Sequence, residues 1–238
     1  MRIEVAFTPG ESIHAPVGIV VDVLRATTTI TQALASGYRR VLCCEEIEEA
    51  RDLRDRLGEG VLGGERGTVP IPGFDLGNSP SEYVEPRGET VILTTTNGTR
   101  AIVSAGARCE LVLVASLLNL DAVAAVARKR GEDAAVICAG VRGAFTIDDA
   151  YVAGRLVESL DGGERADSAE AAARIARSFA SAEAALAASR SGGNLRRAGL
   201  EGDIAWCARE SVSTVVPHLA GLDGTAAVVT VLEPEGPA

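Results

Sequence analysis

The chain reads VGIVVDVLRATTTITQALASGYRRVLCC from Val17 to Cys44, and this stretch contains a complete strand–helix–strand unit. Val17–Val23 is a continuous apolar run, as expected of a strand that is buried on both faces of a sheet. Thr29–Ser36 is predicted to be a helix, and Arg40–Cys44 is predicted to be the next strand. Such a unit indicates an α/β fold in which parallel strands alternate with helices.

The same alternation continues through most of the sequence. Further strands are predicted at Thr90–Thr94, Glu110–Ala115, Ala134–Cys138 and Thr225–Leu232. Further helices are predicted at Glu45–Leu57, Thr99–Ala105, Asn119–Arg130, Thr146–Leu160, Ser168–Ala188 and Asp203–Glu210. We therefore expect a three-layer α/β/α fold with a largely parallel or mixed sheet.

Two segments interrupt this alternation. Gly63–Pro86 is rich in glycine and proline and has little periodicity, and at about two dozen residues it is longer than a usual connection. Its charged and aromatic residues favour a functional loop packed over a site. Ser189–Gly193 is interpreted as a short linker, because it consists of small and polar residues and one arginine.

The length of 238 residues is compatible with one large domain. We expect a single domain over residues 1–238, and a sub-structure of residues 1–85 and 86–238 stays open. Val21–Leu42 and Ile92–Leu113 both read as strand, threonine cluster, helix, glycine and strand. This similarity indicates either two related α/β halves or two units that obey the same packing rules.

Charge and composition disfavour several classes of function and location. A formal net charge of −10 argues against nucleic acid and anionic membranes as partners, because both require a basic face. The five cysteines include no C-x-x-C pair, and no run approaches the roughly 20 apolar residues of a membrane span. Two histidines are too few for a three-histidine metal centre. We expect a cytoplasmic protein, with a homodimer as the commonest state for such an enzyme.

Four short polar segments combine residues that are suited to handling a phosphate. They are residues 22–29 (DVLRATTT), 63–67 (GGERG), 73–80 (GFDLGNSP) and 94–100 (TTTNGTR). Carboxylates can hold a hard cation, whereas arginines, hydroxyls and free N–H groups can hold an anion. The combination predicts metal-assisted chemistry on a phosphorylated small molecule.

The candidate catalytic residues are Asp22, Arg25 and Glu65. Asp22 stands at the end of an apolar strand, where an ionised carboxylate is costly unless it is paired or binds a metal. It is either a magnesium ligand or catalytic carboxylate at the edge of the sheet, or a structural residue that caps a helix or pairs with Arg25. The candidate metal ligands are Asp22, Glu65, Asp75 and Asp148. For Asp148 and its neighbour Asp149, compensation of a helix dipole is the alternative.

The candidate phosphate-binding residues come from the same segments and from one further strand end. They are Thr27, Thr28, Thr29, Arg66, Asn78, Thr95, Thr96, Asn97, Gly98, Thr99 and Gly140. Hydroxyls and backbone N–H groups where a helix begins can bind an anion. A plain turn is the alternative for Asn78.

The usual phosphate-handling motifs are missing. The sequence has no G-x-x-x-x-G-K-[ST] loop, no G-x-S-x-G elbow, no Arg-His-Gly and no Asp-x-Asp starting at Asp22. P-loop enzymes and the common phosphatase classes are therefore disfavoured.

Taken together, the motifs resemble those of the 2-phosphosulfolactate phosphatase (ComB) family. The similar stretches are VDVLRATTT (21–29), GERG (64–67), PGFDLGNSP (72–80), TTTNGT (94–99), CAG (138–140) and FTIDDA (145–150). This resemblance implies an α/β/α fold and Mg²⁺-dependent hydrolysis of 2-phospho-3-sulfolactate to 3-sulfolactate and phosphate, on the route to coenzyme M. A phosphatase of another small phosphorylated acid or sugar, and a non-catalytic small-anion-binding module, stay open as alternatives.

Overall fold

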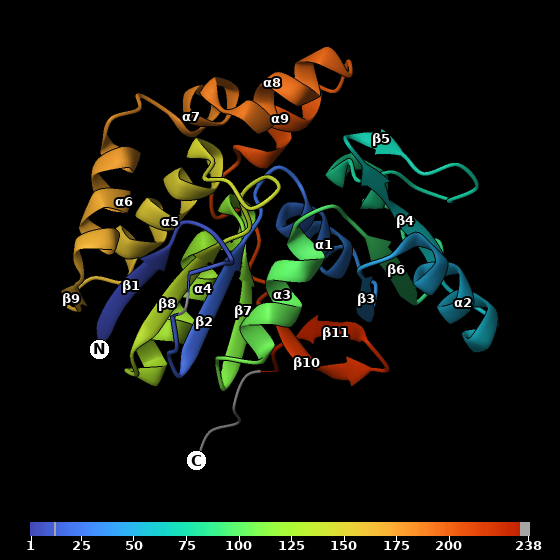
Figure 1. The fold of residues 1–238 in the computed structure, drawn as a ribbon, viewed down its shortest axis with the longest axis horizontal. Helices are drawn as coiled ribbons and strands as arrows, with labels where there is room; N and C mark the ends of the chain where they lie inside the picture. Colours follow the sequence, from blue (N-terminus) through green and yellow to red (C-terminus); the bar gives the residue numbers. More distant parts are fainter. Residues whose placement is uncertain (12, 234–238) are drawn as a thin grey trace.

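The computed structural model describes residues 1–11 and 13–233, and its centre is one mixed β-sheet with helices on both faces (Figure 1). The strand order is β5-β4-β6-β3-β11-β10-β7-β2-β8-β1-β9. This confirms the predicted three-layer α/β/α class. No helix among the described residues is both long and apolar enough to cross a bilayer.

One group of parallel strands forms half of the sheet. It consists of β1 (Arg2–Ala6), β8 (Ala134–Cys138), β2 (Val17–Val21) and β7 (Leu111–Ala115), with the two-residue β9 (Glu164–Arg165) at the edge. Ile19 on β2 lies opposite Val136 on β8 and Leu113 on β7. Every residue of β2 and β8 is buried, which explains their continuous apolar sequences.

A second group of parallel strands forms the other half. It consists of β3 (Arg40–Cys44), β6 (Thr90–Thr94) and β4 (Val61–Arg66), and the short β5 (Val69–Pro70) pairs with β4. The antiparallel hairpin of β10 (Pro217–Asp223) and β11 (Ala226–Val231) joins the two groups, because β10 pairs with β7 and β11 pairs with β3.

The helices fall into layers that follow the alternation of side chains along the strands. Ile19 points into a core that contains residues of α4 (Leu120–Arg130), α5 (Ile147–Ser159), α6 (Asp167–Arg177) and α7 (Ala182–Ala188). Val20 points to the opposite face, into a core shared with α1 (Ala26–Ala35) and α3 (Gly98–Gly106). This second core also contains residues of β3 and β6, so α1 and α3 lie between the two groups of strands. A third core lies under α2 (Ile47–Leu57).

Short helices complete the structure. They are the 3-10 helices η1 (Pro80–Tyr83) and η2 (Leu117–Asn119), and the α-helices α8 (Arg190–Arg197) and α9 (Gly202–Cys207). Helices α7, α8 and α9 pack together above the end of the sheet, in the orange part of Figure 1.

The prediction of one loop over Gly63–Pro86 is wrong at its beginning and at η1. Gly63 and Gly64 belong to β4, and a Cβ atom at Gly64 would lie 2.0 Å from the carbonyl oxygen of Thr94 on β6. A Cβ atom at Gly63 would lie 2.0 Å from the hydroxyl of Tyr83. The glycines permit close packing inside the sheet. In the sequence alone, such glycines cannot be told apart from the glycines of a turn.

Two further predictions fail in the last third of the chain. Ser168–Ala188 is not one helix, because α6 ends at Arg177 and α7 begins at Ala182 behind its capping residue Ser181. Ser189–Gly193 is not a linker but the beginning of α8. Gly192 is required there because a Cβ atom would lie 2.2 Å from the carbonyl oxygen of Leu186 on α7.

No strand was predicted at β1, β4, β10 or the two-residue β5 and β9, and the antiparallel hairpin was therefore not foreseen. The two groups of parallel strands interleave along the chain, since β1 and β2 belong with β7 and β8, whereas β6 belongs with β3 and β4. The division into one domain or into residues 1–85 and 86–238 stays a prediction.

Candidate active site

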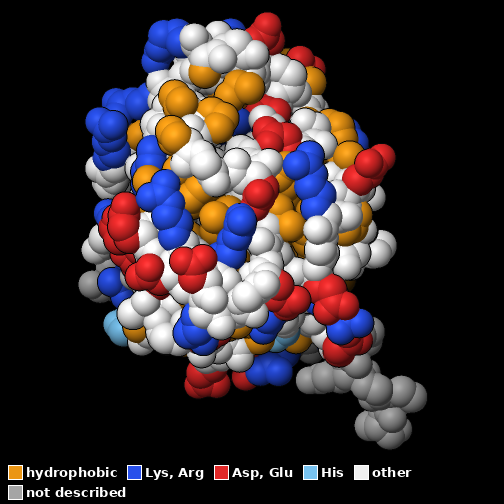
Figure 2. Space-filling model, turned by 90° about the vertical axis from the view of Figure 1, so that its right-hand side faces the viewer, with side chains coloured by type: hydrophobic (Ala, Val, Ile, Leu, Met, Phe, Trp, Pro, Cys, Tyr) orange, Lys and Arg blue, Asp and Glu red, His pale blue; other side chains and the backbone are white. Residues whose placement is uncertain are grey.

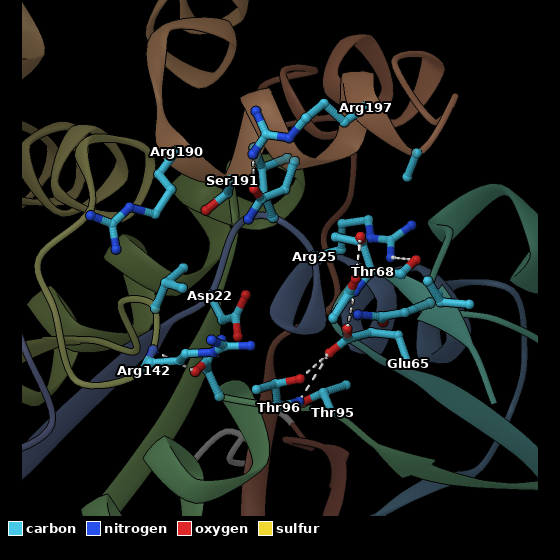
Figure 3. A pocket seen from close by; sticks show the side chains of 18 residues that line it. Asp22, Arg25, Glu65, Thr68, Thr95, Thr96, Arg142, Arg190, Ser191 and Arg197 are labelled. Carbon is cyan, nitrogen blue, oxygen red and sulfur yellow. Dashed lines mark hydrogen bonds between the residues drawn. The ribbon is translucent and has the colours of Figure 1, made fainter.

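A cavity of about 570 Å³ opens where the carboxyl ends of strands from both groups meet the helical segment at α8 (Figure 3). Asp22 follows β2, Glu65 is the second-last residue of β4, Thr95 and Thr96 follow β6, and Arg142 follows β8. Open α/β sheets bind their ligands beyond the carboxyl ends of the strands. The complete lining is Asp22, Leu24, Arg25, Glu65, Gly67, Thr68, Val69, Asn78, Thr95, Thr96, Asn97, Val141, Arg142, Arg190, Ser191, Asn194, Arg197 and Ala198.

Asp22 is a buried acid, with 7% of its surface exposed. Its Oδ1 atom accepts a hydrogen bond from the backbone N–H of Ala26 at 3.3 Å. Burial raises the pKa of Asp22 to about 7, with further contributions from the carboxylates of Asp148 and Glu65, while the Ala26 N–H and Arg25 act in the opposite direction. A carboxyl group in such surroundings gains from a bound cation.

Gly98 lets the beginning of α3 approach Asp22. A Cβ atom at this position would lie 2.8 Å from Oδ2 of Asp22 and 2.4 Å from Cβ of Ala26. The residue at the start of α3 must therefore be glycine for the carboxylate of Asp22 to keep its place. This is a steric role for a residue that the sequence analysis assigned to phosphate binding.

Glu65 is held in one orientation by the segments on either side. Its Oε1 atom accepts hydrogen bonds from the backbone N–H and the hydroxyl of Thr96, at 3.0 and 2.9 Å. Its Oε2 atom accepts a hydrogen bond from the N–H of Thr68 at 2.6 Å. Glu65 therefore joins the end of β4 to the turn after β6, and its side chain faces the cavity beside Thr95 and Thr96 (Figure 3).

Arg25 belongs to a buried polar cluster on the same wall. Its Nη1 atom lies 2.7 Å from Oδ2 of Asp203 on α9 and donates to the hydroxyl of Ser79 at 3.3 Å. The hydroxyl of Ser79 also donates to Oδ2 of Asp203, at 2.7 Å. The charge of Arg25 is therefore compensated within the protein, while its side chain still lines the cavity.

Two adjacent acids at the beginning of α5 support the strand ends. Asp149 accepts hydrogen bonds from the backbone N–H groups of Val23 and Gly140, both at 2.9 Å, and so fixes the turns after β2 and β8. Asp148 is buried, and its Oδ1 atom has no hydrogen-bond partner among the described residues. Burial raises the pKa of both carboxyl groups.

The structure brings seven of the predicted site residues together at the cavity and leaves the others outside its lining. The residues at the cavity are Asp22, Arg25, Glu65, Asn78, Thr95, Thr96 and Asn97. The hydroxyls of Thr27, Thr28 and Thr29 donate instead to the carbonyl groups of Asp22, Val23 and Asn78. These three threonines therefore hold the beginning of α1 against neighbouring segments, and their hydroxyls are engaged.

The remaining predicted residues contact other parts of the fold. Arg66 donates to the carbonyl of Glu45 and to the hydroxyl of Thr94. Asp75 accepts from Arg54 at 2.8 Å and from the N–H of Leu62 at 2.9 Å. Thr99 lies within hydrogen-bond distance of Thr95, at 3.3 Å between hydroxyl oxygens. Gly140 adopts φ +61° and allows close contact with the carbonyl of Ala144. Asp148 lies close enough to Asp22 to raise its pKa, but it does not line the cavity.

Several polar residues that line the cavity were not predicted from the sequence. They are Thr68, Arg142, Arg190, Ser191, Asn194 and Arg197. The spacing of Arg190, Asn194 and Arg197 at i, i+4 and i+7 is a signal for one face of a helix, but the serines and glycines between them indicated a linker. Arg142 lies two residues after Gly140 and close to the end of β8. This position near a strand end is the sequence signal that could have indicated a role for Arg142 in the site.

The residues at the cavity fit a magnesium ion only if substrate or water completes its coordination. The described residues contain no group of three or more His, Cys, Asp and Glu side chains arranged to hold a metal ion. Asp22 and Glu65 line the cavity, and Oδ1 of Asn78 is a buried oxygen without a hydrogen-bond partner in the part of the chain that the structure describes. Mg²⁺ is commonly held by one or two carboxylates, several water molecules and a substrate phosphate, and this donor set matches that pattern.

Known proteins of one family are similar to this chain over almost its whole length. Residues 5–221 match the model of a family described as 2-phosphosulpholactate phosphatase. The chain is similar to a protein of Thermus thermophilus described as a probable 2-phosphosulfolactate phosphatase, with 39% identity over 235 residues, 96% of this chain and 98% of the relative. Relatives with the same description occur in Symbiobacterium thermophilum (41% identity, 88% of this chain and 93% of the relative) and Deinococcus radiodurans (38%, 92% and 93%).

Proposed function

This chain belongs to the 2-phosphosulpholactate phosphatase family, and from that membership we propose that it is a magnesium-dependent phosphomonoesterase acting on 2-phospho-3-sulfolactate. The products are 3-sulfolactate and inorganic phosphate. Family membership makes the chain a phosphatase, a hydrolase, and not a non-catalytic anion-binding module. The route to coenzyme M, the cytoplasmic location and the homodimer stay predictions.

The observation that carries the proposal is the pairing of carboxylates with arginines in one cavity. Asp22 and Glu65 face a space that is also lined by Arg25, Arg142, Arg190 and Arg197. A phosphate dianion placed beside two carboxylates is repelled by them, and a divalent cation between the carboxylates and the phosphate would remove this repulsion. Mg²⁺ held by Asp22 and Glu65 would polarise the phosphoryl oxygens and offset the charge that develops on them.

The other residues supply positioning. Arg142 lines the same cavity as Asp22, and the N–H of Arg142 donates to Oδ1 of Asn97 at 3.0 Å, which ties the turn after β8 to the turn after β6. Arg25 and Arg142 would donate to the phosphoryl oxygens and hold the phosphorus in line with the attacking group. The hydrogen bonds from Thr96 and Thr68 keep Glu65 from rotating away.

Asp22 has two possible roles, metal ligand or nucleophile. As the nucleophile, a carboxylate oxygen of Asp22 attacks phosphorus while the bond to the sulfolactate oxygen breaks, and water then cleaves the acyl phosphate. As the ligand, Asp22 leaves the attack to water. An acid-stable but hydroxylamine-sensitive phosphoenzyme on Asp22 would assign the first role, and its absence in rapid-quench experiments would assign the second.

The direct test is release of phosphate by Asp22→Asn and Glu65→Gln. Each variant should lose at least about 100-fold in kcat, because several kcal/mol of transition-state stabilisation depend on the cation that these carboxylates would hold. Asp121→Asn and Glu48→Gln are matched controls at exposed positions on α4 and α2. Wild-type rates in both cavity variants would refute the assignment.

The substrate is tested separately with a panel of phosphate esters and a titration of Mg²⁺. We expect the highest kcat/KM with 2-phospho-3-sulfolactate and no turnover after chelation of divalent cations. A higher kcat/KM with a phosphorylated acid or sugar that lacks a sulfonate would favour the alternative substrate class. Turnover that is independent of divalent cations would contradict the role of magnesium.

A further inference from the structure

We propose that Arg190 and Arg197 of α8 bind the second, non-reacting acidic group of the substrate, so that the enzyme selects phosphate esters that also carry a sulfonate or a carboxylate. This inference rests on the proposed function, because it assumes that the phosphate is bound near Asp22. It assigns a specificity role to a helix that contributes no residue to the predicted chemistry.

The position of α8 is the first argument. Asp22, Glu65, Thr95 and Thr96 come from the sheet side of the cavity, whereas Arg190 and Arg197 come from the helical wall that faces them (Figure 3). A substrate whose phosphate lies at the sheet side therefore directs the remainder of its skeleton towards α8.

Helix α8 is held in a fixed position by its packing against α7 and by its capping residue. Arg190, Asn194 and Arg197 are spaced at i, i+4 and i+7 and so share the face that lines the cavity. Gly192 and Leu195 are buried, and Gly192 packs against the carbonyl of Leu186. The hydroxyl of Ser189 caps the helix by accepting from the N–H of Gly192 at 2.9 Å. The arginines therefore project from a helix that is anchored on its other side.

Among the described residues, no acidic side chain pairs with Arg190 or Arg197. Within residues 1–11 and 13–233, the side chain of Arg190 forms no hydrogen bond or ion pair, and Arg197 donates only to the neutral Oδ1 of Asn194. Some arginines elsewhere have acidic partners, as in the bidentate contact of Arg155 with Glu210 at 2.7 Å.

One face of the molecule shows how charged side chains are distributed over the surface. On the face shown in Figure 2, acidic and basic side chains are interspersed. Arg190 and Arg197 share a wall of the cavity to which α8 contributes no acid. In a chain with a net charge of −10, this local concentration of positive charge favours an anionic ligand.

The chemistry of the guanidinium group identifies the kind of ligand. Its planar fork of N–H donors matches two oxygens of a carboxylate or a sulfonate, and it stays charged at any pH at which the enzyme folds. Two such groups on one helix face suit an acidic group on the carbon skeleton of the substrate. A phosphate ester without such a group leaves both arginines without an anionic partner.

The test compares Arg190→Gln and Arg197→Gln with Arg196→Gln on three phosphate esters. Arg196 is the matched control, because it lies on the same helix but is exposed outside the cavity. The esters are 2-phospho-3-sulfolactate, 2-phospholactate and isopropyl phosphate, which carry two, one and no further acidic groups. We expect each cavity variant to lose at least about tenfold in kcat/KM on the sulfonated ester, mainly through KM, because each loses charge-assisted hydrogen bonds to the acidic group.

The outcomes separate the two proposals. A loss on the acidic esters that exceeds the loss on isopropyl phosphate by at least about fivefold supports the inference. A loss shared by 2-phospholactate identifies the carboxylate, and a loss confined to the sulfonated ester identifies the sulfonate. Equal losses on all three esters would overturn it while leaving the phosphatase activity intact.

A binding measurement covers the case in which the wild type hydrolyses none of the esters, which would refute the proposed function. Stabilisation by 3-sulfolactate, measured as a shift in Tm, should be present in the wild type and Arg196→Gln and reduced in Arg190→Gln. Equal shifts in the three proteins would overturn the inference independently of turnover.

Discussion

Asp22 is a buried acid that lies close to two other acids, and its environment opposes its ionised form. The carboxyl group is almost fully enclosed, and Asp148 and Glu65 add negative potential to it. Such an arrangement destabilises the folded protein unless a cation compensates it, and it is a common property of residues that act in catalysis.

The pH dependence of stability should reveal this cost. The unfolded chain loses the Asp22 proton near the ordinary pKa of 3.8, whereas the folded protein holds it up to a pKa of about 7. Because the folded pKa is raised, the contribution of Asp22 to stability falls as pH rises from about 4 to 7 and is constant above that range. One pKa unit corresponds to about 1.4 kcal/mol, so the effect is at most about 4 kcal/mol.

Asp22→Asn removes this dependence, since asparagine does not ionise. In chelator at pH 8 we expect the variant to have a higher Tm than the wild type, and the two Tm values should converge as the pH falls towards 4. Mg²⁺ should then raise the Tm of the wild type more than that of the variant. A variant that is less stable than the wild type at pH 8 in chelator would contradict the raised pKa.

At the scale of elements, β4 depends on contacts that tie it to its neighbours. Asp75 receives hydrogen bonds from Leu62 at the beginning of β4 and from Arg54 on α2, so it connects a strand to the helix that covers it. Its side chain is about one-third exposed, which reduces the energy expected of the ion pair. Asp75 is therefore expected to act on the stability of this edge and not on the metal.

Asp75→Asn should lower the free energy of unfolding by about 1 kcal/mol, the usual contribution of such hydrogen bonds. Urea unfolding measures this change. The concentration of Mg²⁺ that gives half-maximal activity should match that of the wild type, measured in parallel with Glu65→Gln. If Asp75→Asn shifted the half-maximal Mg²⁺ concentration as much as Glu65→Gln does, Asp75 would be a metal ligand after all.

Burial and close packing decide which elements could be predicted from the sequence. Val17–Val21 and Ala134–Cys138 are buried on both faces, so their sequences carry the full apolar signal of a strand. At Gly63, Gly64 and Gly192, glycine is required by close packing against a segment distant in the chain or on a neighbouring helix, and no local pattern shows such a contact. Asp22 and Glu65 were found because carboxylates next to glycines or strand ends are unusual, whereas Arg190 and Arg197 were missed together with α8.

At the scale of the whole molecule, the cavity exists only because distant parts of the chain meet. The two groups of strands supply Asp22 and Glu65, and the helical segment closes the other side with α8. The ion pair of Arg25 with Asp203 spans this junction, and only 3% and 8% of the two side chains are exposed. Ser79 joins the pair from the segment that follows β5, so three regions of the chain share one polar cluster.

Removing one member of this cluster should therefore affect both folding and catalysis. Asp203→Ala leaves the guanidinium of Arg25 buried without its acidic partner, and breaking a buried pair in this way costs about 3–5 kcal/mol. Urea unfolding should show that loss, and kcat/KM should fall because Arg25 no longer has a fixed position beside the cavity. Glu210→Gln is the matched control, since its pair with Arg155 is about one-third exposed and should contribute less than about 1 kcal/mol. Equal stability losses in the two variants would show that the junction between the sheet and α9 does not depend on the buried pair.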